Sequence, residues 1–202
     1  MLITDLKKHF KKPLKGAIHI GAFHGEEKPW YNENGISPIV WVEANPEYER
    51  VLKDKYPDDI VIISGVGNEN KTSIFNIANN GQSSSFLKMG THLEQHPSVF
   101  FIDTINIEIK PMKQIIHENS IDINKYNFLN VDVQGYELEV LKGFEDIINN
   151  MDYVYLEVNT NYLYLDCPLI DEIDTYLDSY NLKRVETFIT PNEWGDALYI
   201  KK

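Results

Sequence analysis

The sequence contains no long apolar run, no apolar N-terminal leader and only one cysteine. No stretch approaches the roughly 18 apolar residues that a membrane-spanning helix needs, so we expect no membrane span. The N-terminal lysines are not followed by the apolar core and small-residue cleavage site of a secretory signal. The single cysteine, Cys167, excludes an internal disulfide and is typical of a reducing compartment. Together these absences predict a cytoplasmic protein.

Positively charged residues are also few. Lysine and arginine number 19 against 31 aspartates and glutamates, which gives a formal net charge of −12 at pH 7. This balance opposes general binding to nucleic acid, which requires a basic surface. The exception is a group of five lysines ahead of the first apolar run: Lys7, Lys8, Lys11, Lys12 and Lys15. We interpret them as the solvated face of a helix whose inner face carries Leu2, Leu6 and Phe10; a patch for an anionic ligand is the alternative.

Apolar strands alternate with amphipathic helices along the 202 residues, a length that suits one α/β domain. We expect strands at 15–21, 38–44, 59–64, 128–133 and 153–158, and helices at 26–34, 47–55, 136–144 and 168–180. This alternation favours a parallel sheet with right-handed crossovers. Strands at 183–189 and 196–200 are so close in sequence that they require an antiparallel hairpin.

The two remaining parts of the chain are less regular. We expect an N-terminal helix within 1–14, which Thr4 or Asp5 caps and Pro13 ends, as part of a single domain over 1–202. In the middle we expect a β segment at 72–77, an edge strand at 100–109 and a short helix at 115–121. A loop rich in turn residues, NNGQSSS, lies at 79–85.

The stretch AIHIGAFHGEE, residues 17–27, reads as a buried strand, a glycine turn and the first turn of a helix. Gly21 and Gly25 permit unusual dihedral angles and a close approach of a ligand. The alternative is a strand-to-helix turn that binds nothing. Polar residues also end three other strands, at Glu43, Asp132 and Glu157. Since the carboxyl ends of parallel strands meet at one sheet edge, these residues and His19 predict a site there.

The ligand is indicated by Glu43, which lies about twenty residues after the glycine turn. A carboxylate at this position accepts hydrogen bonds from ribose hydroxyls. The turn lacks the G-x-G-x-x-G spacing of pyrophosphate-binding loops, so a nucleoside without phosphates, as in S-adenosylmethionine, fits better than NAD. The alternative role for Glu43 is an acid that compensates the dipole of the next helix.

Five ordered blocks of the sequence resemble the FkbM-type S-adenosylmethionine-dependent methyltransferases. They are 19–27, WVEANP at 41–46, GQSSS at 81–85, LNVDVQGYELEVLKG at 129–143 and WGDALYIK at 194–201. The resemblance implies the three-layer, Rossmann-like class I methyltransferase fold. That fold has a mostly parallel seven-stranded sheet of order 3-2-1-4-5-7-6, strand 7 antiparallel, with helices on both faces. It also implies methylation of hydroxyl oxygens, mostly on sugars and related metabolites.

By position, the resemblance implies the residues that contact the cofactor. Those around the methionine part are His19, Gly21, Ala22, Phe23, His24 and Gly25. Those near the ribose are Glu43, Ala44 and Asn45, with Gly65 and Val66 beside the adenine. Those on the sulfonium side are Asp132, Val133 and Gln134. His19 stands where many class I enzymes carry an acid, and Gln134 where many family members carry glutamate.

Methyl transfer to a hydroxyl requires an in-line approach and a proton acceptor. Our candidates for this base are Asp132, Glu157 and His24, in that order. A divalent ion held by Asp132, Glu157 and Asp196 is the alternative use of these acids, although no ligand spacing demands a metal. The acceptor pocket is expected from loops over the strand ends, with an oligosaccharide or small molecule contacting Gln82, Ser83, Ser84, Ser85, His92, Tyr136, Tyr162, Tyr164 and Trp194.

Two other functions stay open. A nicotinamide-dependent oxidoreductase would use a related sheet, but the missing second glycine of a phosphate loop argues against it. A catalytically silent cofactor-binding domain, serving a glycan-assembly complex, would bind the cofactor without turnover. The sequence leaves the acceptor and the oligomeric state open.

Overall fold

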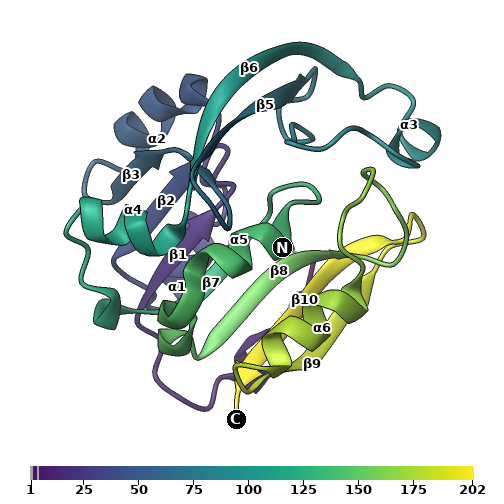
Figure 1. Cartoon of the computed structure of the whole chain (residues 1–202). Helices are drawn as coiled ribbons and strands as arrows, with labels where there is room; N and C mark the ends of the chain where they lie inside the picture. Colours follow the sequence, from purple (N-terminus) through teal and green to yellow (C-terminus); the bar gives the residue numbers. More distant parts are fainter. Residues whose placement is uncertain (1, 4) are drawn as a thin grey trace.

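A seven-stranded sheet forms the centre of the computed structural model, which describes residues 2, 3 and 5–202 (Figure 1). The order of its strands is β3-β2-β1-β7-β8-β10-β9. Their bounds are β1 Gly16–Ile20, β2 Ile39–Glu43, β3 Ile60–Ile63, β7 Tyr126–Val131, β8 Tyr153–Asn159, β9 Leu182–Ile189 and β10 Trp194–Lys201.

β1 pairs in parallel with β2 and β7, as β2 does with β3 and β7 with β8, whereas β10 is antiparallel to both of its neighbours. Counting only these seven strands, the order is 3-2-1-4-5-7-6 with strand 7 antiparallel. The predicted sheet is confirmed.

Helices cover both faces of the sheet (Figure 1). The α-helices are α1 Lys28–Glu33, α2 Glu49–Lys55, α3 His92–Gln95, α4 Met112–Glu118, α5 Glu137–Phe144 and α6 Ile170–Asp178. The 3-10 helices are η1 Lys7–His9, η2 Pro46–Tyr48, η3 Ile123–Lys125 and η4 Glu145–Asn150. Among the described helices, none combines the length and the apolarity needed to traverse a bilayer.

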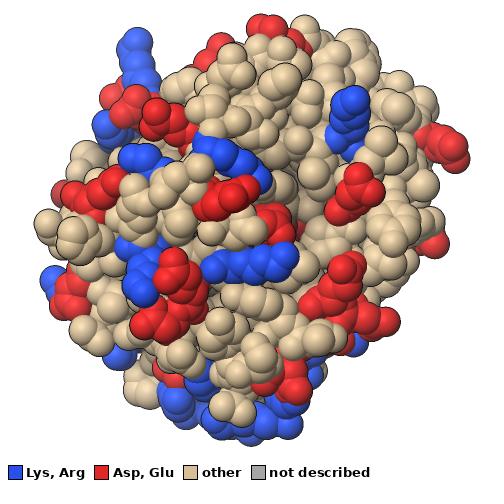
Figure 2. All heavy atoms as spheres, viewed as in Figure 1, with Lys and Arg blue, Asp and Glu red and all other residues tan. Residues whose placement is uncertain are grey.

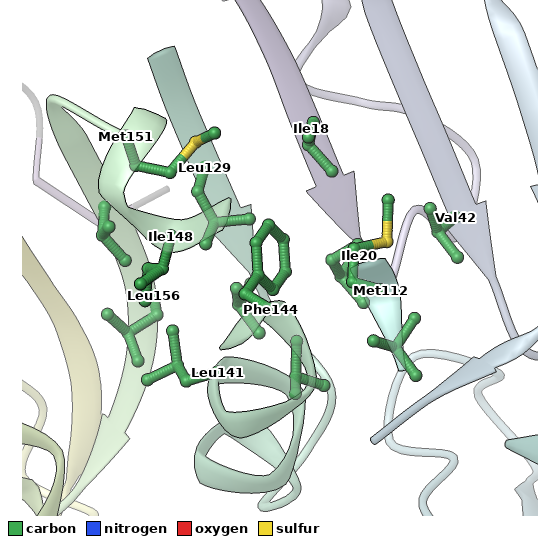
Figure 3. Close-up of a cluster of buried hydrophobic side chains, with 14 of the residues drawn as sticks. Ile18, Ile20, Val42, Met112, Leu129, Leu141, Phe144, Ile148, Met151 and Leu156 are labelled. Carbon is green, nitrogen blue, oxygen red and sulfur yellow. The ribbon is translucent and has the colours of Figure 1, made fainter. Parts of the chain in front are cut away.

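One face of the sheet packs against α4, α5 and α6 through a cluster that is mainly aliphatic. Figure 3 shows Ile18 and Ile20 of β1 beside Met112 of α4, with Phe144 of α5 next to Leu129 of β7. All of these side chains are buried. The strands β1, β2, β7 and β8 are buried on both faces, which explains why their sequences are nearly continuous apolar runs.

The opposite face is aromatic. Tyr31 of α1 packs against Trp41 of β2 and Phe128 of β7, with ring centroids 5.8 Å and 6.1 Å apart. Phe10 extends this cluster and meets the ring of Tyr153 edge-on at 4.9 Å. Edge-to-face and tilted pairs at these separations are favourable geometries for aromatic rings. This face is therefore closed by α1 and the N-terminal segment.

The N-terminal segment forms only the 3-10 turn η1 in place of the predicted helix. After Phe10 the chain is extended, and the backbone N–H of Lys12 donates to the Tyr153 hydroxyl at 2.7 Å. The backbone N–H of Leu2 donates to Asp196 at 2.5 Å and to the Tyr155 hydroxyl at 2.9 Å. Bonds to distant strands thus replace the intrahelical bonds that an isolated amphipathic pattern predicts. The expected cap Thr4 lies outside the described residues.

A second, three-stranded sheet of order β4-β6-β5 lies over the carboxyl ends of the main strands (Figure 1). Its strands are β4 Gly65–Val66, β5 Lys71–Ala78 and β6 Phe101–Lys110. The predicted edge strand at 100–109 is therefore the middle strand of a separate sheet. The connection 79–100, which contains α3, crosses to the other side of the molecule, where Met89 bridges to Tyr164. This connection covers the carboxyl ends of the main strands.

Candidate active site

A cavity of about 400 Å³ opens at the carboxyl ends of β1, β7 and β8. Its walls come from the segment between β1 and α1, from the connection 79–100 and from the start of β10. A narrower cavity of about 60 Å³ adjoins it, between the glycine turn, the end of β2 and β4. Both cavities include Gly21, Phe23, Asp132 and Gln134 in their walls.

The glycine turn brings the ends of β1 and β7 into direct contact. Gly21 has φ +85°, and a Cβ built on it would lie 1.7 Å from the carbonyl oxygen of Asp132. Only glycine permits this backbone conformation and this approach. Phe23 also has positive φ, 44°, and its N–H points at the end of β2. The turn therefore presents backbone rather than side chains to the junction of the two cavities.

Glu43 is held between the glycine turn and the start of η2. Its Oε2 accepts from the N–H of Phe23 and its Oε1 from the N–H of Asn45, both at 2.8 Å. The residue is only 7% exposed, and burial raises the pKa of Glu43 while these backbone donors lower it. Each carboxylate oxygen has a further lone pair. Glu43 is fixed in place yet able to accept further hydrogen bonds.

Gln134 joins two acids from neighbouring strands. Its Nε2 donates to Asp132 Oδ1 at 2.7 Å and to Glu157 Oε2 at 2.8 Å, while its Oε1 accepts from the Tyr164 hydroxyl at 2.8 Å. The amide orientation follows from its partners, because only nitrogen can donate to both carboxylates. Gln134 thus places two carboxyl groups side by side on the cavity floor.

These two acids hold protons more tightly than free carboxyl groups. The Asp132 side chain is open to solvent within the cavity but otherwise enclosed by protein, and this enclosure raises its pKa to about 6. Burial raises the pKa of Glu157 well above its usual value, and the charges of Asp132, Glu137 and Asp196 act in the same direction. Glu157 is 5% exposed, and its Oε1 has no hydrogen-bond partner among the described residues.

The His19 ring is neutral, and its Nδ1 is hydrogen-bonded. Asn130 Nδ2 donates to the Tyr31 hydroxyl at 2.9 Å, so the hydroxyl donates its own proton to His19 Nδ1 at 3.0 Å. Burial lowers the pKa of His19. The ring therefore carries its proton on Nε2 and provides no charge at the end of β1.

Two acids of the site were absent from the sequence prediction. Glu27 lines the larger cavity, with its Oε2 3.9 Å from His19 Nδ1. Glu137 is buried at the start of α5, where its Oε1 accepts from the N–H of Val133 and of Gly135, both at 3.1 Å. Burial raises the pKa of Glu137 to about 7. Both follow a glycine turn within two residues, a position favoured for acids at helix starts.

The predicted acceptor residues separate into groups. Gln82, Ser83, His92 and Trp194 line the larger cavity, and Ser84 and Tyr136 line the narrow one.

The other predicted residues lie elsewhere. Ser85 is buried and donates to the Gln134 carbonyl at 2.7 Å, whereas Tyr162 is 50% exposed and lines neither cavity. His24, a predicted base, also lines neither, because its ring stacks on Phe23 at 3.9 Å. His96, which the prediction missed, lines the larger cavity beside His92.

The acids on the cavity floor do not form a recognisable metal centre. Within 2, 3 and 5–202, no group of three or more histidine, cysteine, aspartate or glutamate side chains is placed to hold a metal ion. The cavity linings also contain no lysine or arginine among these residues.

A family model described as the methyltransferase FkbM domain matches residues 19–184, most of the chain and all the strand ends described above. The chain belongs to this FkbM methyltransferase family. No curated protein matches the sequence.

Solved structures show the same class I fold. A SAM-dependent methyltransferase from Aquifex aeolicus is 10% identical, with a TM-score of 0.50, and the match covers 98% of this chain and 87% of that one. Ribosomal protein L11 methylase from Lactobacillus delbrueckii subsp. bulgaricus is 7% identical, with a TM-score of 0.52 and coverage of 96% and 74%. At such identities the likeness concerns the fold alone.

As an FkbM methyltransferase with the class I fold, the protein depends on S-adenosylmethionine. The residues present fit this group. The Glu43 carboxylate retains free lone pairs beside the glycine turn, and it lines the narrow cavity together with Val66, Val133 and Tyr136. The linings lack the lysine or arginine that the phosphates of a dinucleotide would favour, among the residues described.

Proposed function

We propose that this FkbM methyltransferase transfers the methyl group of S-adenosylmethionine to a hydroxyl of a sugar or glycan. The observation that carries the proposal is the Asp132–Gln134–Glu157 bridge on the floor of the larger cavity. A sugar hydroxyl is a weak acid, so its attack requires a proton acceptor near the methyl group. This bridge supplies carboxyl groups next to the narrow cavity, where a nucleoside fits.

The proposed cofactor position follows from the two cavities. The ribose hydroxyls donate to Glu43, and the adenine lies in the narrow cavity against Val66, Val133 and Tyr136. The methionine part follows the backbone of the glycine turn into the larger cavity. The sulfonium, which carries the methyl group, would then lie near Asp132, a residue that lines both cavities.

In the proposed reaction, Asp132 would accept the proton of the acceptor hydroxyl as the hydroxyl oxygen bonds to the methyl carbon and the methyl–sulfur bond breaks, which leaves S-adenosylhomocysteine. With a pKa of about 6, Asp132 is mostly ionised at pH 7. Gln134 holds Asp132 and Glu157 at fixed positions, and burial raises the pKa of Glu157 well above its usual value. His24 is no longer a candidate base, since its ring lies against Phe23 outside the cavity.

The acceptor wall suits a neutral, hydroxyl-rich molecule. Trp194 and His92 offer ring faces, and Gln82 offers an amide, a combination that matches the apolar faces and polar rims of a sugar. A polynucleotide acceptor is disfavoured by the net charge of −12 and by described cavity linings without lysine or arginine. On the face shown in Figure 2, lysine and arginine are interspersed with acids, apart from one basic group at the lower edge.

The proposal is tested in two steps. Calorimetry is expected to show binding of S-adenosylhomocysteine and none of NADH; the opposite result rejects the cofactor assignment. A screen with methyl-labelled S-adenosylmethionine over nucleotide-sugars and oligosaccharides is then expected to label a hydroxyl oxygen. Labelling of nitrogen or carbon, or of an acceptor other than a saccharide, contradicts the proposed reaction. Cofactor binding without any turnover favours the silent domain instead.

A further inference from the structure

The end of β1 lacks a charge that the bound cofactor requires. The methionine part of S-adenosylmethionine ends in an α-ammonium group, which needs an anionic partner when it leaves water. His19 occupies the end of β1, and its Nδ1 is occupied by the Tyr31 hydroxyl while burial keeps the ring neutral. Another residue must therefore supply the negative charge.

Glu27 lies where such a partner is needed. It precedes α1 directly, and its Oε2 is 3.9 Å from His19 Nδ1. The side chain is 24% exposed, so it is held at the cavity wall without being fully desolvated. Its carboxylate accepts no hydrogen bond from any residue that the structure describes, which leaves it free to take up a cation.

A recess between β7 and β8 also lies next to Glu27. Glu27, Asp132 and Glu157 line this recess, which opens beside the larger cavity. Glu157 is 95% buried, and its Oε1 has no hydrogen-bond partner within 2, 3 and 5–202. Because a buried acceptor atom without a donor is costly, a hydrogen-bond donor beside Glu157 would be favourable.

The structure assigns Glu27 as the residue that binds the α-ammonium of the cofactor, in place of an acid at the end of β1. This inference rests on the proposed binding of S-adenosylmethionine. An ammonium beside Glu27 would pair with the free carboxylate at the recess that Glu157 also lines. No lysine or arginine in the described linings competes for these acids. Charge-assisted bonds of this kind are about twice as strong as neutral ones.

The test compares two ligands on two proteins. S-Adenosylhomocysteine and its deamino analogue, which keeps the carboxylate but lacks the α-amino group, are titrated by calorimetry into wild type and Glu27→Gln. In wild type we expect the deamino analogue to bind about 10- to 100-fold more weakly, the scale for losing a hydrogen bond to a charged group. In Glu27→Gln we expect the affinities of the two ligands to become nearly equal.

Glu33→Gln is the matched control, because it removes the same charge from the exposed side of α1. It is expected to keep the wild-type preference. Equal binding of both ligands by the wild-type protein overturns the assignment, and this comparison requires no variant. A full preference retained by Glu27→Gln also overturns it. Failure of wild type to bind S-adenosylhomocysteine at all rejects the proposed cofactor rather than the role of Glu27.

Discussion

The Glu43 carboxylate is the residue whose contribution to cofactor binding is most directly measurable. Glu43→Ala removes the acceptor for the ribose hydroxyls and also the bonds that orient Phe23 and Asn45. We expect the binding free energy of S-adenosylhomocysteine to weaken by about 1–3 kcal/mol, the range for hydrogen bonds to charged groups. Calorimetry measures this binding free energy, and Glu47→Ala, at an exposed position, is the control. Unchanged affinity in a folded Glu43→Ala protein removes Glu43 from the site.

Asp132 is expected to serve the chemical step more than cofactor binding. Asp132→Asn keeps the size and the bond from Gln134 but removes the proton acceptor, so we expect turnover to fall by about 10²–10⁴-fold with little change in cofactor affinity. The pKa of about 6 gives the pH dependence. The base works only when ionised, so wild-type turnover rises as pH increases through about 6 and levels off above 7.

Glu157→Gln provides the comparison for this experiment. If turnover survives in Asp132→Asn but is lost in Glu157→Gln, the base is Glu157. If EDTA abolishes turnover and a divalent ion restores it, these carboxylates are metal ligands and the proton-acceptor role of Asp132 is refuted.

At the scale of elements, the turn between β7 and α5 depends on Glu137. Its buried carboxylate accepts from two backbone N–H groups of the turn that carries Gln134. Glu137→Ala leaves both donors unsatisfied, so we expect a loss of about 2–4 kcal/mol in the free energy of unfolding. Glu137→Gln keeps an acceptor oxygen and is expected to lose much less. Chemical denaturation measures both, and equal losses would mean that packing rather than hydrogen bonding matters here.

The same residue makes stability depend on pH. Burial raises the pKa of Glu137 to about 7 in the folded state, against about 4.5 when unfolded. As pH rises from about 4.5 to 7, the unfolded state ionises first, so the contribution of Glu137 to stability falls across this window. Glu137→Gln removes that portion of the pH dependence. Denaturation of both proteins at pH 4.5 and at pH 8 reveals the difference.

The elements that were predictable from the sequence are those whose pattern depends on burial alone. The apolar runs of β1, β2, β7 and β8 and the short loop before β10 are sufficient to predict a parallel sheet that ends in an antiparallel hairpin, whereas the strand order came from the family resemblance. The conformation of the N-terminal segment was not predictable, because Phe10 and Lys12 contact Tyr153 of β8, which is distant in sequence. Two strands of the small sheet, β5 and β6, were predicted, but their pairing into a separate sheet was not, because the two strands are distant in sequence.

Site residues divide in a similar way. Glu43 and Asp132 were predictable because a polar residue at the end of an apolar strand is unusual. Glu27 and Glu137 were not, since acids at helix starts are common whether or not they face a site. The exclusion of His24 depends on the stacked ring of Phe23, which no local pattern indicates.

For the whole molecule, cofactor binding is linked to global stability. A ligand that binds only the folded state stabilises it by about 2.7 kcal/mol at 100 times its Kd. For a chain of this size, that corresponds to a rise of about 5–11 °C in Tm. Differential scanning fluorimetry with S-adenosylhomocysteine is expected to show this rise, and none with NADH. No shift with either ligand contradicts a cofactor site formed by the folded chain.

The roof of the larger cavity is built separately from its floor. His92, His96 and Val99 come from the connection 79–100 and Leu163 from the segment after β8, whereas Glu43 and Asp132 belong to strand ends of the main sheet. These two roof segments also reach the floor, because Ser85 and Tyr164 both donate hydrogen bonds to Gln134. Segments exchanged between relatives can therefore alter which acceptor is admitted only if they keep these two donors, since Gln134 holds the carboxyl groups of Asp132 and Glu157 in place.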